Sequence, residues 1–250
     1  MTPRDTIAAL GAGRMGRGIA IAFAFAGHEV ALVDFKPRDK TAFDKLAAEA
    51  LNDIRTTLTM LSRVGMLSAA DVAPILARVR VVAEADAAKA LRNAAIIFEG
   101  VPEVVDLKRE ALARASELAG PEPIIASTTS TILVDDLSRA VAQPRRFLNA
   151  HWLNPAFLVP LVEVSPGAAT DPAVTVRLKA MLESIGKVPV VCAATPGYIV
   201  PRIQALAMNE AARMVEEGVA SAEDIDKAIK YGFGFRFAVL GMLEFIDWGG

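Results

Sequence analysis

The sequence has little of the chemistry from which disulfide frameworks and metal centres are built. Its 250 residues include one cysteine, Cys192, and two histidines, His28 and His151. One cysteine cannot form an internal disulfide, and so few histidines and cysteines assemble no metal cluster. Cys192 stands in an apolar run, which is typical of a small buried hydrophobe rather than a nucleophile. We therefore expect neither a disulfide nor a metal site.

The chain also lacks an excess of one charge and a long apolar run. Its 27 Lys and Arg residues against 29 Asp and Glu give a net charge of -2, which offers no electrostatic footprint for nucleic acid. Although 53% of the residues are hydrophobic, no uncharged run reaches the roughly 18 residues that a membrane helix needs. The apolar stretch 7–10 is too short for a signal peptide. We predict a cytoplasmic protein without nucleic-acid or membrane partners.

What the sequence does have is a glycine-rich turn between a strand and a helix. Residues 6–10 predict a buried strand and residues 15–26 an apolar helix. Between them, Gly11 permits a tight turn, Gly13 lets the backbone approach a pyrophosphate, and Gly16 lets the helix pack closely on the sheet. The alternative is an ordinary strand-to-helix turn.

The residues after this turn favour a dinucleotide cradle. Gly27 ends the helix, and residues 29–33 predict a second strand that closes on Asp34. A carboxylate there would accept the adenosine ribose hydroxyls and repel a 2′-phosphate, so we predict NAD rather than NADP. Lys36 is the one nearby residue that argues against this preference.

Further strands and helices alternate as far as about residue 193, after which the pattern is helical. The sequence thus predicts an α/β fold: a Rossmann-type, doubly wound, mostly parallel sheet with a C-terminal all-α domain. We expect an NAD-binding domain over 1–193, a helical insertion within it over 38–78, and a helical domain over 194–250. The basic residues around the insertion suggest a solvated face, with a site for a charged ligand tail as the alternative: Lys36, Arg38, Lys40 and Lys45.

Polar residues follow two of the expected strands at the edge where open α/β folds bind ligands. Glu103 comes after the strand 95–99, and a run of five hydroxyl residues, 127–131, follows the strand 123–126. Glu103 could be merely a helix-start carboxylate, and hydroxyl residues commonly cap helices. Five of them exceed what one cap needs.

The segments 146–151 and 159–164 are two extended runs that can pair as antiparallel strands. Pairing about Phe157 would place His151 opposite Glu163 on one face of the sheet. A carboxylate fixes the tautomer of a histidine and stabilises the imidazolium, which is the arrangement of a general base. Beside a nicotinamide, this pair would serve the oxidation of an alcohol; a histidine satisfied within a strand is the alternative.

Over nearly the whole chain, these motifs resemble the 3-hydroxyacyl-CoA dehydrogenase family. The most specific element is the His-x-x-Asn-Pro segment 151–155, followed by the glutamate at position 163. The other similar segments are the cofactor motif 11–16 with Asp34, the pair 102–103 with Lys108, the hydroxyl loop 127–131, and the segments 196–198 and 215–218.

The resemblance implies the roles of individual residues. His151 would be the base and Glu163 its orienting partner, while Ser130 and Asn154 would hold the substrate's reacting oxygen. Residues that would bind NAD are Gly11, Gly13, Arg14, Met15, Gly16 and Asp34, with Glu103 and Lys108 on the nicotinamide side. The implied reaction is oxidation of a 3-hydroxyacyl-CoA, such as 3-hydroxybutyryl-CoA, to the 3-keto form, as in fatty acid metabolism.

Three departures keep other functions open. Pro201 stands where the family has an asparagine. Family members continue through further helices that help to form a dimer, so the helical domain here looks incomplete, although the resemblance still implies a homodimer. The segment 232–237 looks more like carnitine and gulonate dehydrogenases, where Arg236 could bind a free carboxylate. The alternatives are therefore a dehydrogenase of a CoA-free 3-hydroxy acid, or a non-catalytic NAD-binding protein like the lambda-crystallins.

Overall fold

The computed structural model describes residues 5–249 in two units, each of which is considered by itself. The first unit ends at Tyr198 and the second begins at Ile199. The predicted boundary lies at 193/194, five residues before the observed one. Among the helices described, none is long and apolar enough to cross a membrane.

The first unit is built on one eight-stranded sheet with the order β3-β2-β1-β4-β5-β6-β7-β8. All neighbouring strands are parallel except β6 and β7, which confirms the mostly parallel, Rossmann-type sheet. The strands are β1 (Thr6–Leu10), β2 (Val30–Val33), β3 (Val79–Val82), β4 (Ala94–Glu99), β5 (Ile124–Ser127), β6 (Phe147–Trp152), β7 (Leu161–Pro166) and β8 (Val188–Val191).

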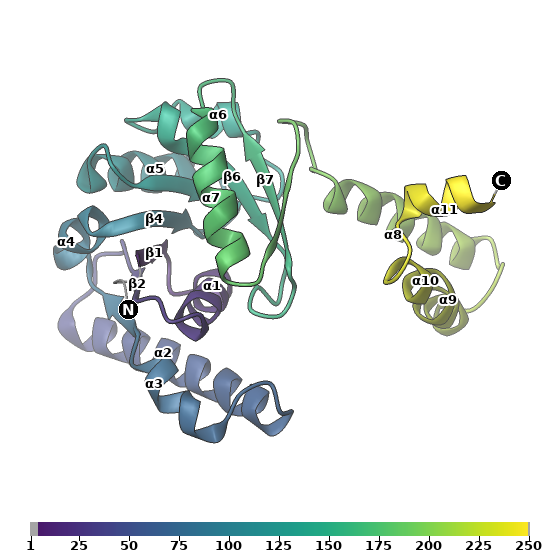
Figure 1. Ribbon diagram of the computed structural model, residues 1–250, viewed down its shortest axis with the longest axis horizontal. Coiled ribbons are helices and arrows are strands. Elements are labelled where there is room, and N and C mark those ends of the chain that lie inside the picture. Colours follow the sequence, from purple (N-terminus) through teal and green to yellow (C-terminus); the bar gives the residue numbers. More distant parts are fainter. Residues whose placement is uncertain (1–4, 250) are drawn as a thin grey trace. The chain divides into compact units, whose positions relative to one another are not determined.

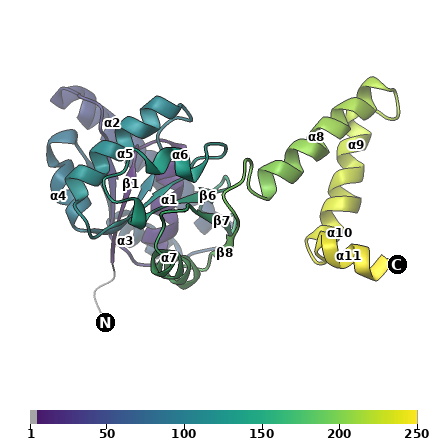
Figure 2. The ribbon, with the colours of Figure 1, turned by 90° about the horizontal axis from the view of Figure 1, so that it is seen from above.

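Helices cover both faces of this sheet, so its central strands are almost wholly apolar. Alternate residues of β1 belong to different cores: Ile7 packs under α1, α2, α3 and α7, and Ala8 under α4, α5 and α6. Figures 1 and 2 show α7 on one side of the sheet and α5 and α6 on the other. These helices are α1 (Arg14–Phe25), α2 (Lys40–Arg63), α3 (Val72–Leu76), α4 (Ala87–Arg92), α5 (Val105–Ala119), α6 (Val134–Ser138) and α7 (Pro172–Ser184).

Short 3-10 turns complete the first unit at Ala69–Asp71, Glu84–Asp86 and Pro144–Arg146. The expected insertion over 38–78 consists of α2, one of these turns and α3. Asp39 caps α2 by accepting a hydrogen bond from the backbone N–H of Ala42, as a helix start requires.

The second unit is helical. Pro201 lies in the first turn of α8, where a backbone N–H has no partner within the helix, so the proline is tolerated there. Apart from Ile225, the described apolar side chains of this unit remain at least partly exposed. The helices are α8 (Val200–Glu216), α9 (Ala222–Ala228), the π-helical η4 (Ile229–Gly234), α10 (Phe235–Phe237) and α11 (Met242–Gly249).

Candidate functional site

The glycine turn leaves β1 and enters α1 at the carboxyl edge of the sheet. Gly11 has a φ of 92°, a conformation that side chains disfavour. A Cβ on Gly16 would lie 2.1 Å from the Gly11 carbonyl oxygen, whereas one on Gly13 would meet nothing within 4 Å. Gly16 therefore allows close packing, and Gly13 leaves open space against the backbone at the N-terminus of α1. This shape fits the pyrophosphate of a dinucleotide.

Asp34 follows β2 at the same edge, but its carboxylate is already engaged. Its Oδ2 lies 2.5 Å from Nε of Arg38, and its Oδ1 accepts a 3.4 Å hydrogen bond from the Lys36 backbone N–H. The nearby cation that bears on cofactor preference is thus the Arg38 guanidinium, while Lys36 contacts Asp34 through its backbone. A cavity of about 250 Å³ opens beside this group, lined by Phe35, Lys36, Pro37, Val101, Pro102, Leu107, Glu110, Ala111 and Arg114.

We expect Arg38→Ala to sharpen the preference for NAD. If Asp34 receives the ribose, Arg38 both neutralises its repulsion of a 2′-phosphate and offers that phosphate a partner. The ratio of the NADP to the NAD dissociation constant should rise about tenfold, which corresponds to roughly 1.4 kcal/mol. Cofactor fluorescence titration measures both constants, and Lys45→Ala, which removes an exposed cation of α2, is the control. An unchanged ratio would remove Arg38 from this role.

A buried ion pair supports the loop after β4. Lys108 is only 1% exposed, and its Nζ lies 2.9 Å from Oε1 of Glu99 and 3.3 Å from Oε2 of Glu103. The same ammonium donates a hydrogen bond to the Val101 carbonyl oxygen, and Ser127 donates its hydroxyl to Glu99. Glu99 therefore joins Lys108 of α5 to Ser127 at the end of β5, and Lys108 presents almost no surface to a ligand.

Glu103 holds the hydroxyl loop. One of its carboxylate oxygens accepts hydrogen bonds from the hydroxyl of Thr129 at 2.5 Å and from the backbone N–H groups of Ser130 and Thr131 at 2.9 and 3.1 Å. Burial alone would raise the pKa of Glu103, but the hydrogen bonds from Thr129, Ser130 and Thr131 together with the charge of Lys108 lower that pKa. Glu103 is thus an ionised anchor of the loop.

The anchors leave part of the hydroxyl loop available. Ser127 is bonded to Glu99, and Thr129 and Thr131 are bonded to Glu103. Ser130 is half-buried, and its hydroxyl makes no hydrogen bond to any residue within 5–249. This explains five consecutive hydroxyl residues: several fix the loop, and Ser130 can still bind a ligand.

The β6–β7 pair brings His151 and Glu163 together as the sequence predicts. These two residues are direct partners in the antiparallel register, and Nδ1 of His151 lies 2.8 Å from Oε2 of Glu163. A carboxylate only accepts, so Nδ1 carries the hydrogen and Nε2 of a neutral ring is a lone-pair acceptor. Nε2 has no partner in the part of the chain that the structure describes. The pair can therefore take a proton at Nε2.

Tyr198, for which the sequence predicts no role in the site, packs on this histidine. Its ring is stacked on that of His151, with centroids 5.0 Å apart and planes 8° from parallel. Its hydroxyl donates to the Thr129 carbonyl oxygen at 2.9 Å and accepts from Nδ2 of Asn149 at 3.0 Å. The segment 196–198 resembles the family's sequence, but that resemblance does not predict this contact.

The loop 153–160 between β6 and β7 carries Asn154, and Lys187 holds its backbone in place. Nζ of Lys187 donates to the carbonyl oxygens of Ala156 and Val159, at 2.7 and 2.8 Å. Burial lowers the pKa of this ammonium, which lies over the Trp152 ring. The backbone of the Asn154 loop is thereby fixed to β8.

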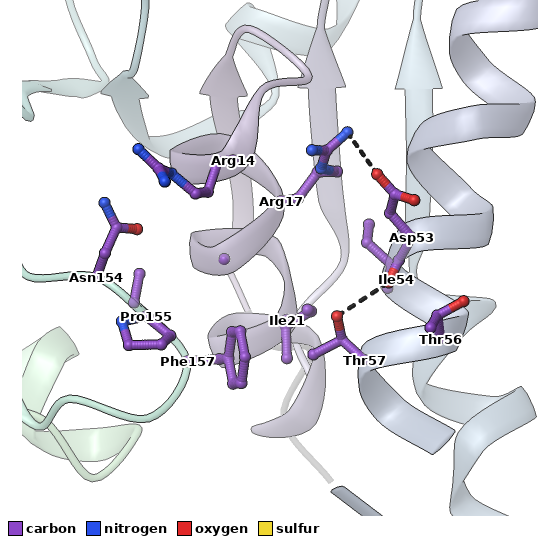
Figure 3. Close-up of a pocket in the computed structure, with 12 residues that line it drawn as sticks. Arg14, Arg17, Ile21, Asp53, Ile54, Thr56, Thr57, Asn154, Pro155 and Phe157 are labelled. Atoms are coloured by element: carbon purple, nitrogen blue, oxygen red, sulfur yellow. Dashed lines mark hydrogen bonds and ion pairs between the residues drawn. The ribbon is translucent and has the colours of Figure 1, made fainter. Parts of the chain in front are cut away.

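This loop forms one wall of a cavity of about 480 Å³. Figure 3 shows its other walls, α1 and α2, and the ion pair of Arg17 with Asp53 at 3.0 Å. Arg14 and Asn154 lie near each other at one end, and both are exposed. Arg14 has no ion-pair partner within the described range 5–249, so its charge is available to an anionic ligand.

Among residues 5–249 no group of three or more His, Cys, Asp or Glu is placed to hold a metal ion. Cys192 is half-buried rather than buried, and it directly follows β8, which lies at the edge of the sheet. Burial and the charge of Glu163 raise the pKa of its thiol, which makes it a poor nucleophile. Arg236 stacks over Phe245 within the second unit.

Comparison with family models gives two matches that together span most of the chain. Residues 6–195 match "3-hydroxyacyl-CoA dehydrogenase, NAD binding domain", and residues 197–249 match "3-hydroxyacyl-CoA dehydrogenase, C-terminal domain". The division between the matches falls in the same segment as the division between the two structural units.

Several relatives are similar over nearly all of this chain. The 5-formyl-3-hydroxy-2-methylpyridine 4-carboxylate 5-dehydrogenase of Mesorhizobium japonicum is 31% identical over 98% of this chain and 75% of its own length. Lambda-crystallin of Oryctolagus cuniculus is 33% identical over 94% of this chain and 72% of its own. The crystal structure of (S)-3-hydroxybutyryl-CoA dehydrogenase from Ralstonia eutropha has a TM-score of 0.82 and 32% identity, covering 92% of this chain and 78% of that one.

Proposed function

Because the chain belongs to the family of NAD-dependent 3-hydroxyacyl-CoA dehydrogenases, which act on CH–OH groups, we propose that it oxidises the 3-hydroxyl of a 3-hydroxyacyl-CoA to the 3-keto form. The observation that carries this proposal is the 2.8 Å contact of His151 with Glu163 together with the available Nε2. A proton acceptor at the edge of a dinucleotide-binding sheet suits the oxidation of an alcohol.

The proposed roles follow from the contacts of each residue. Nε2 of His151 takes the proton of the substrate hydroxyl, and Glu163 stabilises the resulting imidazolium through Nδ1–H. The Ser130 hydroxyl and the Asn154 amide hydrogen-bond the reacting oxygen. Bound NAD would supply the hydride acceptor for the carbon that carries that oxygen.

The cofactor would be held by the glycine turn and by Asp34. We propose that Gly11, Gly13 and Gly16 shape the seat for the pyrophosphate, with Arg14 and Met15 in the first turn of α1 beside it. Glu103 and Lys108 contribute indirectly, because their contacts fix the loop that carries Ser130.

A CoA-free 3-hydroxy acid is the second candidate substrate. The observation that favours it is the exposed Arg14 guanidinium beside Asn154, which could pair with a free carboxylate. One relative is named for a pyridine carboxylate substrate that carries no CoA. A non-catalytic role like that suggested by the name of the crystallin relative is the third candidate.

One panel of substrates separates the three candidates. NAD reduction is followed at fixed enzyme concentration with 3-hydroxybutyryl-CoA, longer 3-hydroxyacyl-CoAs, carnitine and gulonate. We expect the highest kcat/KM with a thioester. A higher value with a free acid would move the assignment to the second candidate, and NAD binding without any turnover would move it to the third.

The Pro201→Asn variant, tested on the same substrates, separates the thioester assignment from the free-acid assignment more clearly. If the family's asparagine amide helps to stabilise the reacting oxygen, restoring it should raise kcat/KM for the thioester by about tenfold or more, since one such donor is worth a few kcal/mol. The melting temperature should change little, because proline in the first turn of α8 costs no helix hydrogen bond. A gain on no thioester and a loss on a free acid would contradict the acyl-CoA assignment.

We also propose that a second copy of the chain covers apolar side chains of the helical unit. Among those that are at least 70% exposed are Leu206, Phe235, Val239, Leu243 and Trp248. Large apolar surfaces of this kind commonly mark protein interfaces. Sedimentation velocity of the full chain should give a dimer; a monomer at all concentrations would contradict this proposal.

A further inference from the structure

Tyr198 contacts both the proposed base, His151, and the loop that carries Ser130. It is 6% exposed, although it is the last residue of the first unit. Its φ of 45° makes it the one non-glycine residue with positive φ among those described. Such a backbone costs free energy for any residue with a Cβ, and it persists where the surrounding contacts hold it. For Tyr198 these contacts include those of its side chain, beside the hydrogen bond from its backbone N–H to the Thr195 carbonyl oxygen.

The ring of Tyr198 restricts the motion that Glu163 leaves to the histidine. The hydrogen bond at Nδ1 fixes one atom of the imidazole, but the ring can still tilt about that atom. The Tyr198 ring lies nearly flat against one imidazole face, at 8° between planes. Together the two contacts define the direction in which Nε2 points.

The hydroxyl of Tyr198 connects the same ring to the substrate-binding loop. It donates to the carbonyl of Thr129, the residue before Ser130, and accepts from Asn149, which lies two positions before His151 on β6. Residues two apart on a strand share a face. Burial raises the pKa of the Tyr198 phenol, so it stays a donor through the ordinary pH range.

We propose that Tyr198 is a positioning residue, which holds the His151 imidazole and the Ser130 loop in fixed register for proton removal. This inference rests on the proposed function, because it takes His151 as the base. Its ring acts on the base and its hydroxyl acts on the loop. The two contributions can therefore be removed separately.

Two variants separate them. Tyr198→Phe keeps the stacked ring and removes both hydrogen bonds, while Tyr198→Leu removes the ring as well. The matched control is Tyr231→Leu, because Tyr231 is the chain's other tyrosine, lies in the second unit and is 72% exposed. Steady-state kcat and KM across pH, the dissociation constant of NAD and the melting temperature are measured for each.

We expect Tyr198→Leu to lower kcat by about tenfold to a hundredfold, the scale expected when a reacting group is misplaced by up to about 1 Å. The acid limb of its rate profile should move along the pH axis. Tyr198→Phe should keep the shape of that profile and mainly raise the substrate KM, because the Ser130 loop keeps its bonds to Glu103 but loses the one from the Tyr198 hydroxyl to the Thr129 carbonyl. NAD binding should be unchanged in both variants, and Tyr231→Leu should match the unsubstituted protein.

Histidine NMR gives a readout that does not depend on turnover. The chain has two histidines, and His28 hydrogen-bonds the carbonyl of Asp5, the residue before the amino end of β1. In protein labelled with ¹⁵N at histidine, the His151 ring signals should broaden or shift in Tyr198→Leu and stay close to their original positions in Tyr198→Phe. The His28 signals should move in neither variant.

The outcomes distinguish this proposal from the proposed function. If His151→Ala is inactive but Tyr198→Leu keeps kcat within about twofold and an unmoved pH profile, Tyr198 does not position the base. Unperturbed His151 signals in Tyr198→Leu would overturn the proposal as well. If His151→Ala stays active, the proposed function fails instead, and the histidine signals still decide whether Tyr198 fixes the ring. Should Tyr198→Leu not fold, the KM and the histidine signals of Tyr198→Phe decide the question.

Discussion

Replacing His151 with alanine should lower kcat by about 10²- to 10⁴-fold, the usual contribution of a positioned general base. The substituted side chain acts on the substrate's hydroxyl proton, so the dissociation constant of NAD should stay nearly the same. Stopped-flow or steady-state NADH formation with the best substrate of the panel measures the first quantity, and fluorescence titration measures the second.

His28→Asn is the matched control, because it removes the only other imidazole. Any activity it loses should follow the loss of folded protein, since His28 lies in the turn before β2 and bonds a backbone carbonyl. A loss of less than about tenfold in His151→Ala would mean that another group removes the proton. Glu163→Gln should slow the reaction less than His151→Ala does and move the acid limb of the rate profile.

Replacing Lys108 with methionine should destabilise the first unit by about 3–5 kcal/mol, the cost of leaving one partner of a buried ion pair without the other. Methionine fills a similar volume but leaves the Glu99 carboxylate, which is 0% exposed, without its counter-ion. Urea denaturation gives the change in the free energy of unfolding.

Lys40→Met is the matched control for this loss. Lys40 also forms an ion pair in the same unit, with Asp44, but its side chain is 88% exposed. Exposed pairs of this kind contribute about 0.2–1 kcal/mol or less. Equal effects of the two substitutions, or a loss below about 1 kcal/mol in Lys108→Met, would contradict the structural role given to the buried pair.

The sequence predicted those parts of the site that depend on local patterns. The dinucleotide cradle was predicted from a strand, a turn and a helix that follow one another directly in the sequence. The first strand, β1, begins at Thr6 and ends at Leu10, as predicted. The pairing of His151 with Glu163 could be predicted because two strands joined by a short loop have few possible registers.

The contacts that were missed join residues whose proximity depends on how distant segments pack. Glu99 ends an apolar strand, and nothing in that strand marks it as the partner of Lys108. Tyr198 contacts His151, although β7, α7 and β8 lie between the two residues in the sequence. Arg38 was identified as part of a solvated face, but a turn after β2 brings its guanidinium onto Asp34. Charge and hydropathy patterns carry no information on such packing.

His151 and Glu163 lie on the two strands of the sheet's one antiparallel pair. This origin limits which insertions and deletions the two strands can accept. His151 and Glu163 share a face because they are direct partners in the antiparallel register of β6 and β7. Since successive strand residues point to opposite faces, a slip of this register by one residue would turn the Glu163 carboxylate away from the imidazole, unless a bulge absorbed the change. The side chains of the loop 153–160 other than Asn154 can therefore vary, while the register of the two strands is constrained by parity.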